Sequence, residues 1–300
     1  MKRLLILSGK GGTGKTTVAG AFIFLAQAQS YADCDVDAPN LHLLVHPKDK
    51  PNTEPFLGMP KYEIDSEICR GCGRCFSICR FDAIRTKDDR FEIVCERCEG
   101  CAACTLVCPE KAIFSSLEPT GELHLHLSPA FFSTARLRPG SGNSGLMVTR
   151  VKERLREASQ SEMEILDGSP GIGCPVIASM SGTDLILAVT EPSLSGLYDL
   201  SRILKTAEGF RIPVIVCLNK ANVNPGLASQ IDAFCEKIGI PMVGHIPFDP
   251  NVVRLTNAGQ SVVEEDCPSG NAIRVLFPKV MTYLKTVGNE VKNDYSSSFE

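Results

Sequence analysis

The chain has 300 residues, of which 43% are hydrophobic and 22% are charged, and its formal net charge is −4. This is the composition of a globular protein with roughly two domains, and the slight acidic excess argues against nucleic acid as the main partner. No apolar run approaches the ~18 residues of a membrane span, and the short apolar start at residues 4–7 has no signal-peptide cleavage site after it, so we expect a cytoplasmic protein.

Short apolar runs alternate with helix-like stretches along most of the chain. Residues 4–8 predict a buried strand, 9–17 a glycine-rich loop, 18–28 a buried helix and 31–35 a second strand. Later strands are expected at 164–167, 185–190, 214–218 and 243–246, and helices at 151–158, 196–208, 227–238 and 272–284. This alternation predicts an α/β fold whose parallel sheet is covered by helices on both faces.

The loop after the first predicted strand fits a phosphate-binding motif. Residues 9–16 satisfy G-x-x-x-x-G-K-[ST] between a strand and a helix. Glycines let backbone N–H groups approach phosphate oxygens, and the helix N-terminus adds the positive end of its dipole. We expect Lys15 to bridge the β- and γ-phosphates of ATP and Thr16 to bind Mg²⁺. The predicted nucleotide-binding residues here are Gly9, Gly11, Gly12, Thr13, Gly14, Lys15, Thr16 and Thr17.

The same loop also fits a dinucleotide-binding fingerprint. The glycines at 9, 11 and 14 match G-x-G-x-x-G, and Asp33 lies about twenty residues further on, where a ribose-binding acid belongs. That alternative leaves Lys15 and Thr16 without a role. We therefore favour a P-loop NTPase fold.

Polar residues follow several predicted strands. Asp33 and Asp35 end the second strand, Asp167 ends the strand at 164–167, and Asn219 follows the strand at 214–218. Open α/β sheets bind ligands at the carboxyl ends of their strands. We expect Asp33 and Asp167, the latter in the Walker-B position, to hold the Mg²⁺ shell, and a carboxylate after the second strand to orient the attacking water. Asn219 is expected to contact adenine. Turn-forming and capping roles are the alternative for each residue alone.

Residues 57–116 break the alternation, because they are rich in cysteine and lack a long helix. Residues 67–84 match residues 96–113 at an offset of 29. Such a duplication predicts two copies of one small unit stacked on each other. We therefore expect a discontinuous ATPase domain, residues 1–56 and 117–287, interrupted by a small α+β ferredoxin-like domain at 57–116, with a mobile tail at 288–300.

Cysteine is concentrated in this insertion. Nine of the 14 cysteines lie between Cys69 and Cys108, whereas a disulfide scaffold would spread them through a small secreted chain, so metal ligation is favoured. Both runs have the C-x2-C-x2-C-x3-C spacing of bacterial ferredoxins, in which the fourth cysteine ligates the other cluster. The spacing predicts two [4Fe–4S] clusters: cluster 1 on Cys69, Cys72, Cys75 and Cys108, and cluster 2 on Cys98, Cys101, Cys104 and Cys79. The alternative is a zinc site with thiolate ligands. Four cysteines in each of two runs are too many and too regularly spaced for such a site.

Two other cysteines lie close to these motifs. Cys95 precedes the second run, and Cys174 follows the predicted Walker-B turn. We interpret both as structural thiols. A redox role for Cys95 and a contact across a dimer for Cys174 are the alternatives.

The phosphate loop is more specific than a generic one. Residues 10–17 resemble the deviant Walker A of the MinD/Mrp and nitrogenase-iron-protein class of ATPases, and residues 33–41, 167–171 and 247–249 are similar to its switch I, switch II and adenine loop. The resemblance implies a homodimer or paralogue heterodimer in which Lys10 reaches the partner subunit's phosphates. It also implies that Asp35 orients water and that Pro247 and Asp249 lie at the adenine. The catalytic residues are then Lys10, Lys15 and Asp35. The insertion narrows the resemblance to MinD-superfamily ATPases that carry a ferredoxin domain.

These predictions combine into one mechanism, in which ATP binding, hydrolysis and dimerisation are coupled to the clusters. We favour electron transfer between redox partner proteins, because eight ligands in complete ferredoxin runs indicate permanent clusters. The alternative is an assembly or carrier ATPase that delivers clusters to apo-iron–sulfur proteins. A nucleotide-sensing regulator with negligible turnover is a third possibility.

Overall fold

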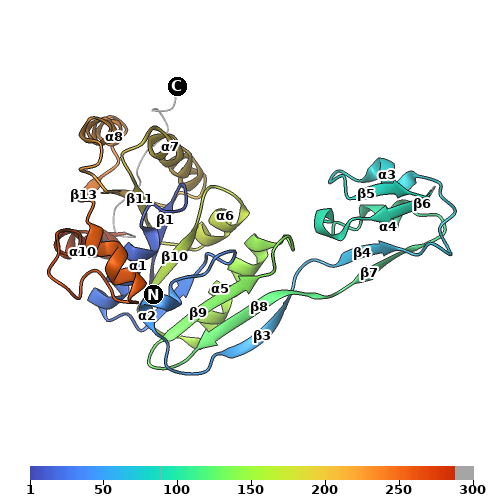
Figure 1. Ribbon diagram of the computed structural model, residues 1–300, viewed down its shortest axis with the longest axis horizontal. Helices are drawn as coiled ribbons and strands as arrows, with labels where there is room; N and C mark the ends of the chain where they lie inside the picture. The colour runs from blue at the N-terminus through green and yellow to red at the C-terminus, as the bar shows by residue number, and fades with distance from the viewer. Residues whose placement is uncertain (89, 288–300) are drawn as a thin grey trace.

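The computed structural model describes residues 1–88 and 90–287, so the tail predicted to be mobile lies outside the described residues. Within them, one large sheet contains, side by side, β13 (Met242–Ile246), β12 (Val214–Asn219), β11 (Leu185–Thr190), β1 (Lys2–Ser8), β10 (Met163–Pro170), β2 (Ser30–Asp33), β9 (Phe131–Leu137), β8 (Pro119–His126) and β3 (Asn52–Leu57) (Figure 1). The strands from β13 to β9 are parallel, and β8 and β3 continue the sheet in antiparallel pairing. The predicted α/β fold with a parallel sheet is confirmed.

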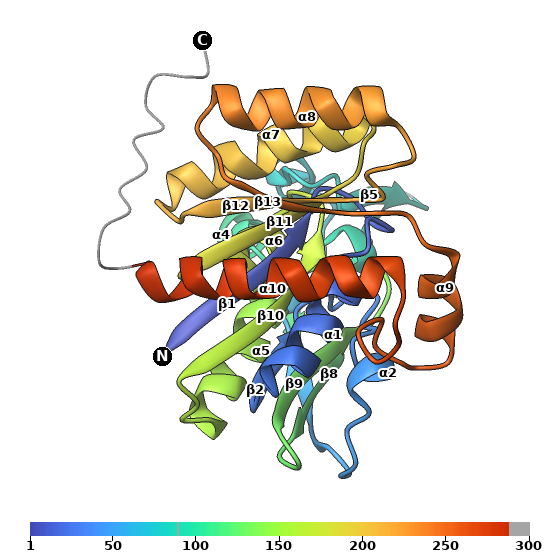
Figure 2. The same cartoon turned by 90° about the vertical axis from the view of Figure 1, so that its left-hand side faces the viewer.

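The sheet is buried on both faces. In β1, Leu4 and Ile6 belong to one core, and Leu5 and Leu7 belong to the other. The first core lies under α1 (Lys15–Ala26), α2 (His42–Val45), α9 (Pro250–Asn257) and α10 (Pro268–Thr286), and the second under α5 (Ser144–Ala158), α6 (Cys174–Met180), α7 (Leu194–Gly209) and α8 (Pro225–Lys237). Figure 2 shows α1 and α10 on the opposite side of the strands from α7 and α8. Continuous apolar strand sequences are typical of such doubly covered parallel strands.

Most predicted elements lie where the sequence places them. Strand β11 covers the predicted 185–190, whereas the first helix begins at Lys15 rather than at residue 18, because left-handed Gly14 (φ 91°) ends the loop directly before it. Helix α5 begins at Ser144, ahead of the predicted 151. Helices α2, α6 and α9 and strands β3 and β9 were not predicted. Three of these are helices of at most eight residues, too short for a clear helical period.

A β arm carries the cysteine-rich segment away from the sheet. Strands β3 and β8 lead into β4 (Lys61–Ile64) and β7 (Ile113–Ser116), which pair with each other. Beyond them lie α3 (Arg74–Ile78), β5 (Ile84–Lys87), β6 (Arg90–Ile93), the 3-10 turn η1 (Cys95–Arg97) and α4 (Ala103–Val107). Figure 1 shows this cysteine-rich unit, residues 61–116, at the end of the arm. We keep the boundaries predicted for the inserted domain as a proposal.

The cysteine-rich unit repeats with the offset seen in the sequence. Strand β4, helix α3 and strand β5 lie 29 residues before β6, α4 and β7, respectively. Strand β4 pairs with β7, and β5 pairs with β6, so each small sheet takes one strand from each copy. This exchange ties the two copies together.

Among the described residues, no helix is both long and apolar enough to span a bilayer.

Candidate nucleotide site and cysteine pockets

The loop between β1 and α1 has the backbone of a phosphate cradle. Gly12 (φ 78°) and Gly14 (φ 91°) are left-handed, a conformation that glycine adopts at little cost. A Cβ added at Gly14 would lie 2.3 Å from Asn219 Nδ2, so close packing also requires glycine there. At Gly11 and Gly12 an added Cβ would meet nothing within 4 Å. The loop is therefore open on the side where a phosphate could approach.

Two buried charges meet beside this loop. Lys15 Nζ lies 2.5 Å from Asp167 Oδ1, and the two side chains are 6% and 0% exposed. Burial acts to lower the pKa of Lys15, but Asp167 and the neighbouring carboxylates raise it above its ordinary value. The second oxygen of Asp167, Oδ2, is buried and has no hydrogen-bond partner within residues 1–88 and 90–287. A buried carboxylate oxygen without a partner costs free energy. The carboxylates of Asp33 and Asp167 and the hydroxyl of Thr16 are an oxygen donor set that fits Mg²⁺.

Asp33 organises the segment that follows β2. Its buried carboxylate accepts backbone hydrogen bonds from Asp35 (3.0 Å), Asn40 (2.9 Å) and Leu41 (2.9 Å). Burial, together with the nearby charge of Asp167, raises the pKa of Asp33 to about 7. These contacts wrap residues 35–41 around the end of the strand. Asp35 is placed close enough for its charge to act on Lys15.

The segments predicted as switch I and switch II are bonded to each other. The Cys34 N–H donates to the Asp167 carbonyl (2.8 Å), and Ser169 Oγ donates to the Cys34 carbonyl (2.5 Å). Both contacts are buried. These contacts hold the two segments together at the ends of β2 and β10.

Lys10 rests on the connection between β11 and α7. Its ammonium lies 2.5 Å from Glu191 Oε1 and hydrogen-bonds to the hydroxyls of Ser195 (3.0 Å) and Ser193 (3.3 Å). Glu191 also pairs with Lys220 at 2.9 Å. The side chain of Lys10 is one-third exposed, so it can be reached from outside the subunit.

A pocket beside the loop brings the predicted adenine residues together. It is lined by Gly12, Gly14, Thr17, Asn219, Pro247, Phe248 and Asp249, with side chains from α9 and α10. Two of these residues already have partners. Asn219 Nδ2 donates to the Thr13 carbonyl (2.7 Å), and Asp249 caps α9 by accepting from the Asn251 N–H (2.9 Å). Asp249 therefore fixes the loop that lines the pocket.

The eight predicted cluster ligands fall into two groups of four. One pocket is lined by Cys69, Cys72, Cys75 and Cys108, and a second by Cys79, Cys98, Cys101 and Cys104. Apolar side chains enclose both, among them Ile64, Phe91 and Ile113 at the first and Tyr62, Ile84 and Ile93 at the second. Four thiols in an apolar pocket are a donor set that fits a [4Fe–4S] cluster. Among the described residues, no three Cys, His, Asp or Glu side chains converge closely enough for a single metal ion.

The thiols differ in their surroundings. Cys72 is exposed, and the backbone N–H of Arg74 and the guanidinium of Arg70 lower its pKa. Burial raises the pKa of Cys75, and it raises that of Cys104 to about 11. Ligation requires thiolates, so metal binding at the buried positions must offset this burial. Cys95 lines neither of the two pockets.

The cysteine-rich unit contacts the α/β body beside the second pocket. A Cβ added at Gly142, in the loop between β9 and α5, would lie 3.6 Å from the Glu99 carboxylate and 3.9 Å from Lys61 Nζ. The Lys61 ammonium in turn donates to the Cys98 carbonyl. The β9–α5 loop therefore adjoins the run that begins at Cys98.

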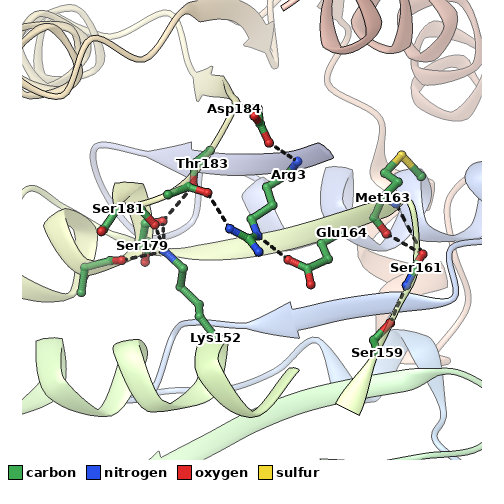
Figure 3. A network of polar contacts seen from close by, with 12 residues as sticks. Arg3, Lys152, Ser159, Ser161, Met163, Glu164, Ser179, Ser181, Thr183 and Asp184 are labelled. Carbon is green, nitrogen blue, oxygen red and sulfur yellow. Dashed lines mark hydrogen bonds and ion pairs between the residues drawn. The ribbon is translucent and has the colours of Figure 1, made fainter. Parts of the chain in front are cut away.

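The same loop leads into α5, which packs along α6. At the start of α5, a Cβ on Gly145 would lie 3.1 Å from Cys174 Cβ. Further along, the buried Lys152 ammonium donates to three carbonyls at the end of α6, those of Ala178, Ser179 and Ser181 (2.8, 2.7 and 2.5 Å; Figure 3). Because α6 directly follows the Asp167 segment, α5 links that segment to the loop beside Glu99.

The sequence analysis did not identify three charged residues of this region. Glu191 directly follows the predicted strand at 185–190, so the strand-end argument applied to Asp167 and Asn219 could have found it. Lys61 and Lys152 bind carbonyls that are distant in sequence, at separations of 37 and 26 to 29 residues. No local pattern signals such contacts.

Comparisons with known proteins agree with this geometry. The CobQ/CobB/MinD/ParA nucleotide binding domain matches residues 4–262. The uncharacterised protein MJ0578 of Methanocaldococcus jannaschii is 31% identical over 287 residues, which cover 94% of this chain and 97% of that protein. An iron-sulfur cluster carrier protein of Pyrococcus horikoshii is 22% identical over 316 residues, covering 97% and 88%. The structure of the septum site-determining protein MinD of Pyrococcus horikoshii, complexed with Mg-ADP, superimposes with a TM-score of 0.57 at 17% identity, covering 97% and 99%.

Proposed function

The chain belongs to the CobQ/CobB/MinD/ParA family of nucleotide-binding domains, and we propose that it is an ATPase that delivers [4Fe–4S] clusters to apo-proteins. The observation that carries the delivery step is the similarity to a named cluster carrier over 97% of the chain. This reverses the order of our sequence-based hypotheses, because the comparisons support the carrier better than electron transfer. The predicted relation to the MinD superfamily is confirmed.

The nucleotide chemistry follows from the residues around the loop. ATP, when bound with Mg²⁺, supplies the energy of its terminal phosphoanhydride bond. We expect Lys15 to exchange Asp167 for phosphate oxygens, which leaves the Asp167 carboxylate for the Mg²⁺ shell together with Asp33 and Thr16. We expect Asp35 to orient the attacking water. In a dimer, Lys10 would exchange Glu191 for the partner subunit's nucleotide.

The cysteine pockets provide for the cargo. Four thiolates at each pocket would hold one [4Fe–4S] cluster, and such a cluster supplies either transferable iron and sulfide or one-electron redox chemistry. A second candidate function, electron transfer, is favoured by one observation: each pocket has a complete set of four thiols, all from the same unit. Delivery requires at least one of these sets to release its cluster to a partner.

We propose that the two sites communicate through α6 and α5. Nucleotide binding displaces the Asp167 segment, and α6 follows it directly. The Cys174–Gly145 contact and the Lys152 anchor join α6 to α5. The β9–α5 loop would then change its contact with Glu99 beside the second pocket. Binding can shift this equilibrium only as far as nucleotide affinity differs between the two arrangements.

Cluster transfer to a test acceptor separates the two candidates. Anaerobically reconstituted protein is mixed with apo-aconitase in the presence of an iron chelator, with and without Mg-ATP. Delivery predicts recovery of aconitase activity and loss of iron from this protein, both faster with Mg-ATP and not accelerated by it in Lys15→Ala. Reduction of an oxidised ferredoxin without any activation of apo-aconitase would instead establish electron transfer.

A further inference from the structure

The two copies of the repeat share a backbone but differ in charge. Arg70 and Arg74 of the first copy correspond to Glu99 and Ala103 of the second. Residues 68–81 contain three arginines and no acidic residue, whereas residues 97–110 contain one arginine and two glutamates. The two ends of the unit therefore differ in surface charge.

The second copy faces its own chain. A Cβ added at Gly100 would lie 2.6 Å from the Pro60 carbonyl and 2.7 Å from Met59 Cβ. This run therefore packs directly on the segment that connects β3 and β4. Glu99 adjoins the β9–α5 loop through Gly142. The predicted site of cluster 2 is thus on the side of the unit that adjoins residues 59–60 and the β9–α5 loop.

The predicted site of cluster 1 lies beside an open groove that both copies line. A groove between α3 and α4 is lined by Cys72 and Cys108, two predicted ligands of cluster 1, and by the apolar side chains Phe76, Ile78 and Leu106. Phe76 is 50% exposed and Leu106 is 87% exposed. Exposed apolar side chains gathered beside a functional group usually mark a binding surface.

Positive charge lies at the edge of this groove. Arg74 is one of its lining residues, and Arg70 lies close to Cys72 and 3.0 Å from Glu110. Charged groups at the rim of an interface select partners of opposite charge and increase the rate of association. A second copy of this chain would bring the same arginines to the interface, so like charges would oppose that arrangement.

We propose that the cluster-1 face, formed by Arg70, Cys72, Arg74, Phe76, Ile78 and Leu106, docks an apo-iron–sulfur protein with an acidic rim around an apolar centre. This proposal rests on the proposed function and adds to it the surface to which the acceptor protein binds. The body adjoins the run that begins at Cys98, beside cluster 2, and the partner binds at cluster 1. The acidic rim meets the arginines, and the apolar centre covers Leu106 and Phe76.

Direct binding tests this surface without requiring transfer. The probe is a small acidic apo-ferredoxin with a fluorescent label, titrated with the full-length reconstituted protein under anaerobic conditions at 20 mM and 300 mM salt. The same ferredoxin with its surface carboxylates changed to amides is the second probe. We compare the wild type with Arg74→Glu and Leu106→Glu, and with Arg97→Glu as the matched charge reversal in the other copy. Iron content and visible absorbance verify that each variant keeps its clusters.

The proposal predicts that Arg74→Glu and Leu106→Glu each weaken binding of the acidic probe on the order of tenfold at low salt. Arg97→Glu should change it less than about twofold, and the amide probe should bind weakly to every variant. Equal binding of both probes, or equal loss with Arg97→Glu, overturns the docking assignment while leaving the proposed function intact. Wild-type protein that binds no iron but retains selective binding contradicts the proposed function and leaves the docking assignment standing.

Discussion

Lys152→Met tests whether α5 anchors α6. The ammonium makes three buried hydrogen bonds to the end of α6, and bonds from a charged donor contribute about 1.5–3 kcal/mol each, or about 5–9 kcal/mol together. Burial opposes this gain, because it lowers the pKa of Lys152 from 10.5 to about 8, which corresponds to about 3 kcal/mol. We therefore expect the substitution to lower the free energy of unfolding by about 2–6 kcal/mol.

The lowered pKa of Lys152 also predicts how the stability difference between the wild type and the variant changes with pH. Between pH 8 and 10.5 the unfolded chain keeps the Lys152 proton, whereas the folded chain has lost it. The unfolded state then binds more protons, so the wild type gains stability relative to the variant as pH rises through this window. Urea unfolding of cluster-free protein followed by circular dichroism, at pH 7.5 and 9.5, measures the difference. The exposed Lys237→Met is the control. A loss below about 0.5 kcal/mol would refute the anchoring role. A difference that narrows at pH 9.5 would contradict the lowered pKa of Lys152.

Three other experiments test separate parts of the account. Lys15→Ala should reduce ATP turnover at least about a hundredfold in a phosphate-release assay. The exposed Lys205→Ala is the control and should leave turnover unchanged. Activity that survives in Lys15→Ala would show that the active site lies elsewhere in the protein. Gly100→Ala should lower the iron content of the unit without changing nucleotide affinity, because its Cβ meets the Pro60 carbonyl and its φ is +72°; full iron retention would contradict the tight packing there. Cys108→Ser and Cys69→Ser should alter the same EPR signal and leave that of cluster 2 intact, whereas changes in two different signals would contradict the crossed ligand sets.

The sequence predicts the parallel sheet well because its strands are buried on both faces. Leu4 to Leu7 are apolar at successive positions, a pattern that requires cover on each side. The phosphate loop and the cysteine runs could be identified because their chemistry fixes residue type and spacing locally. The grouping of Cys108 with Cys69, and of Cys79 with Cys98, follows from the ferredoxin spacing, in which the fourth cysteine of each run ligates the other cluster.

Contacts between distant elements were beyond a sequence argument. In the sequence, Lys152 cannot be distinguished from the other charged residues of an amphipathic helix. Its role becomes visible only once α6 lies beside α5. Asp249 was expected at the adenine, and its capping of α9 depends on a short helix that has no clear period. The proximity of Gly142 to Glu99 joins the β9–α5 loop to the cysteine-rich unit, two segments that are distant in the sequence.

The central claim is that the nucleotide site and the cluster sites act on each other within one chain. The EPR spectrum of anaerobically purified, reduced protein, recorded with and without a non-hydrolysable Mg-ATP analogue and with iron quantified in the same sample, tests it most directly. The account predicts about eight irons per chain and a nucleotide-dependent change in the signal of cluster 2 that is absent in Lys15→Ala. Zinc in place of iron, or identical spectra with both clusters present, would contradict it.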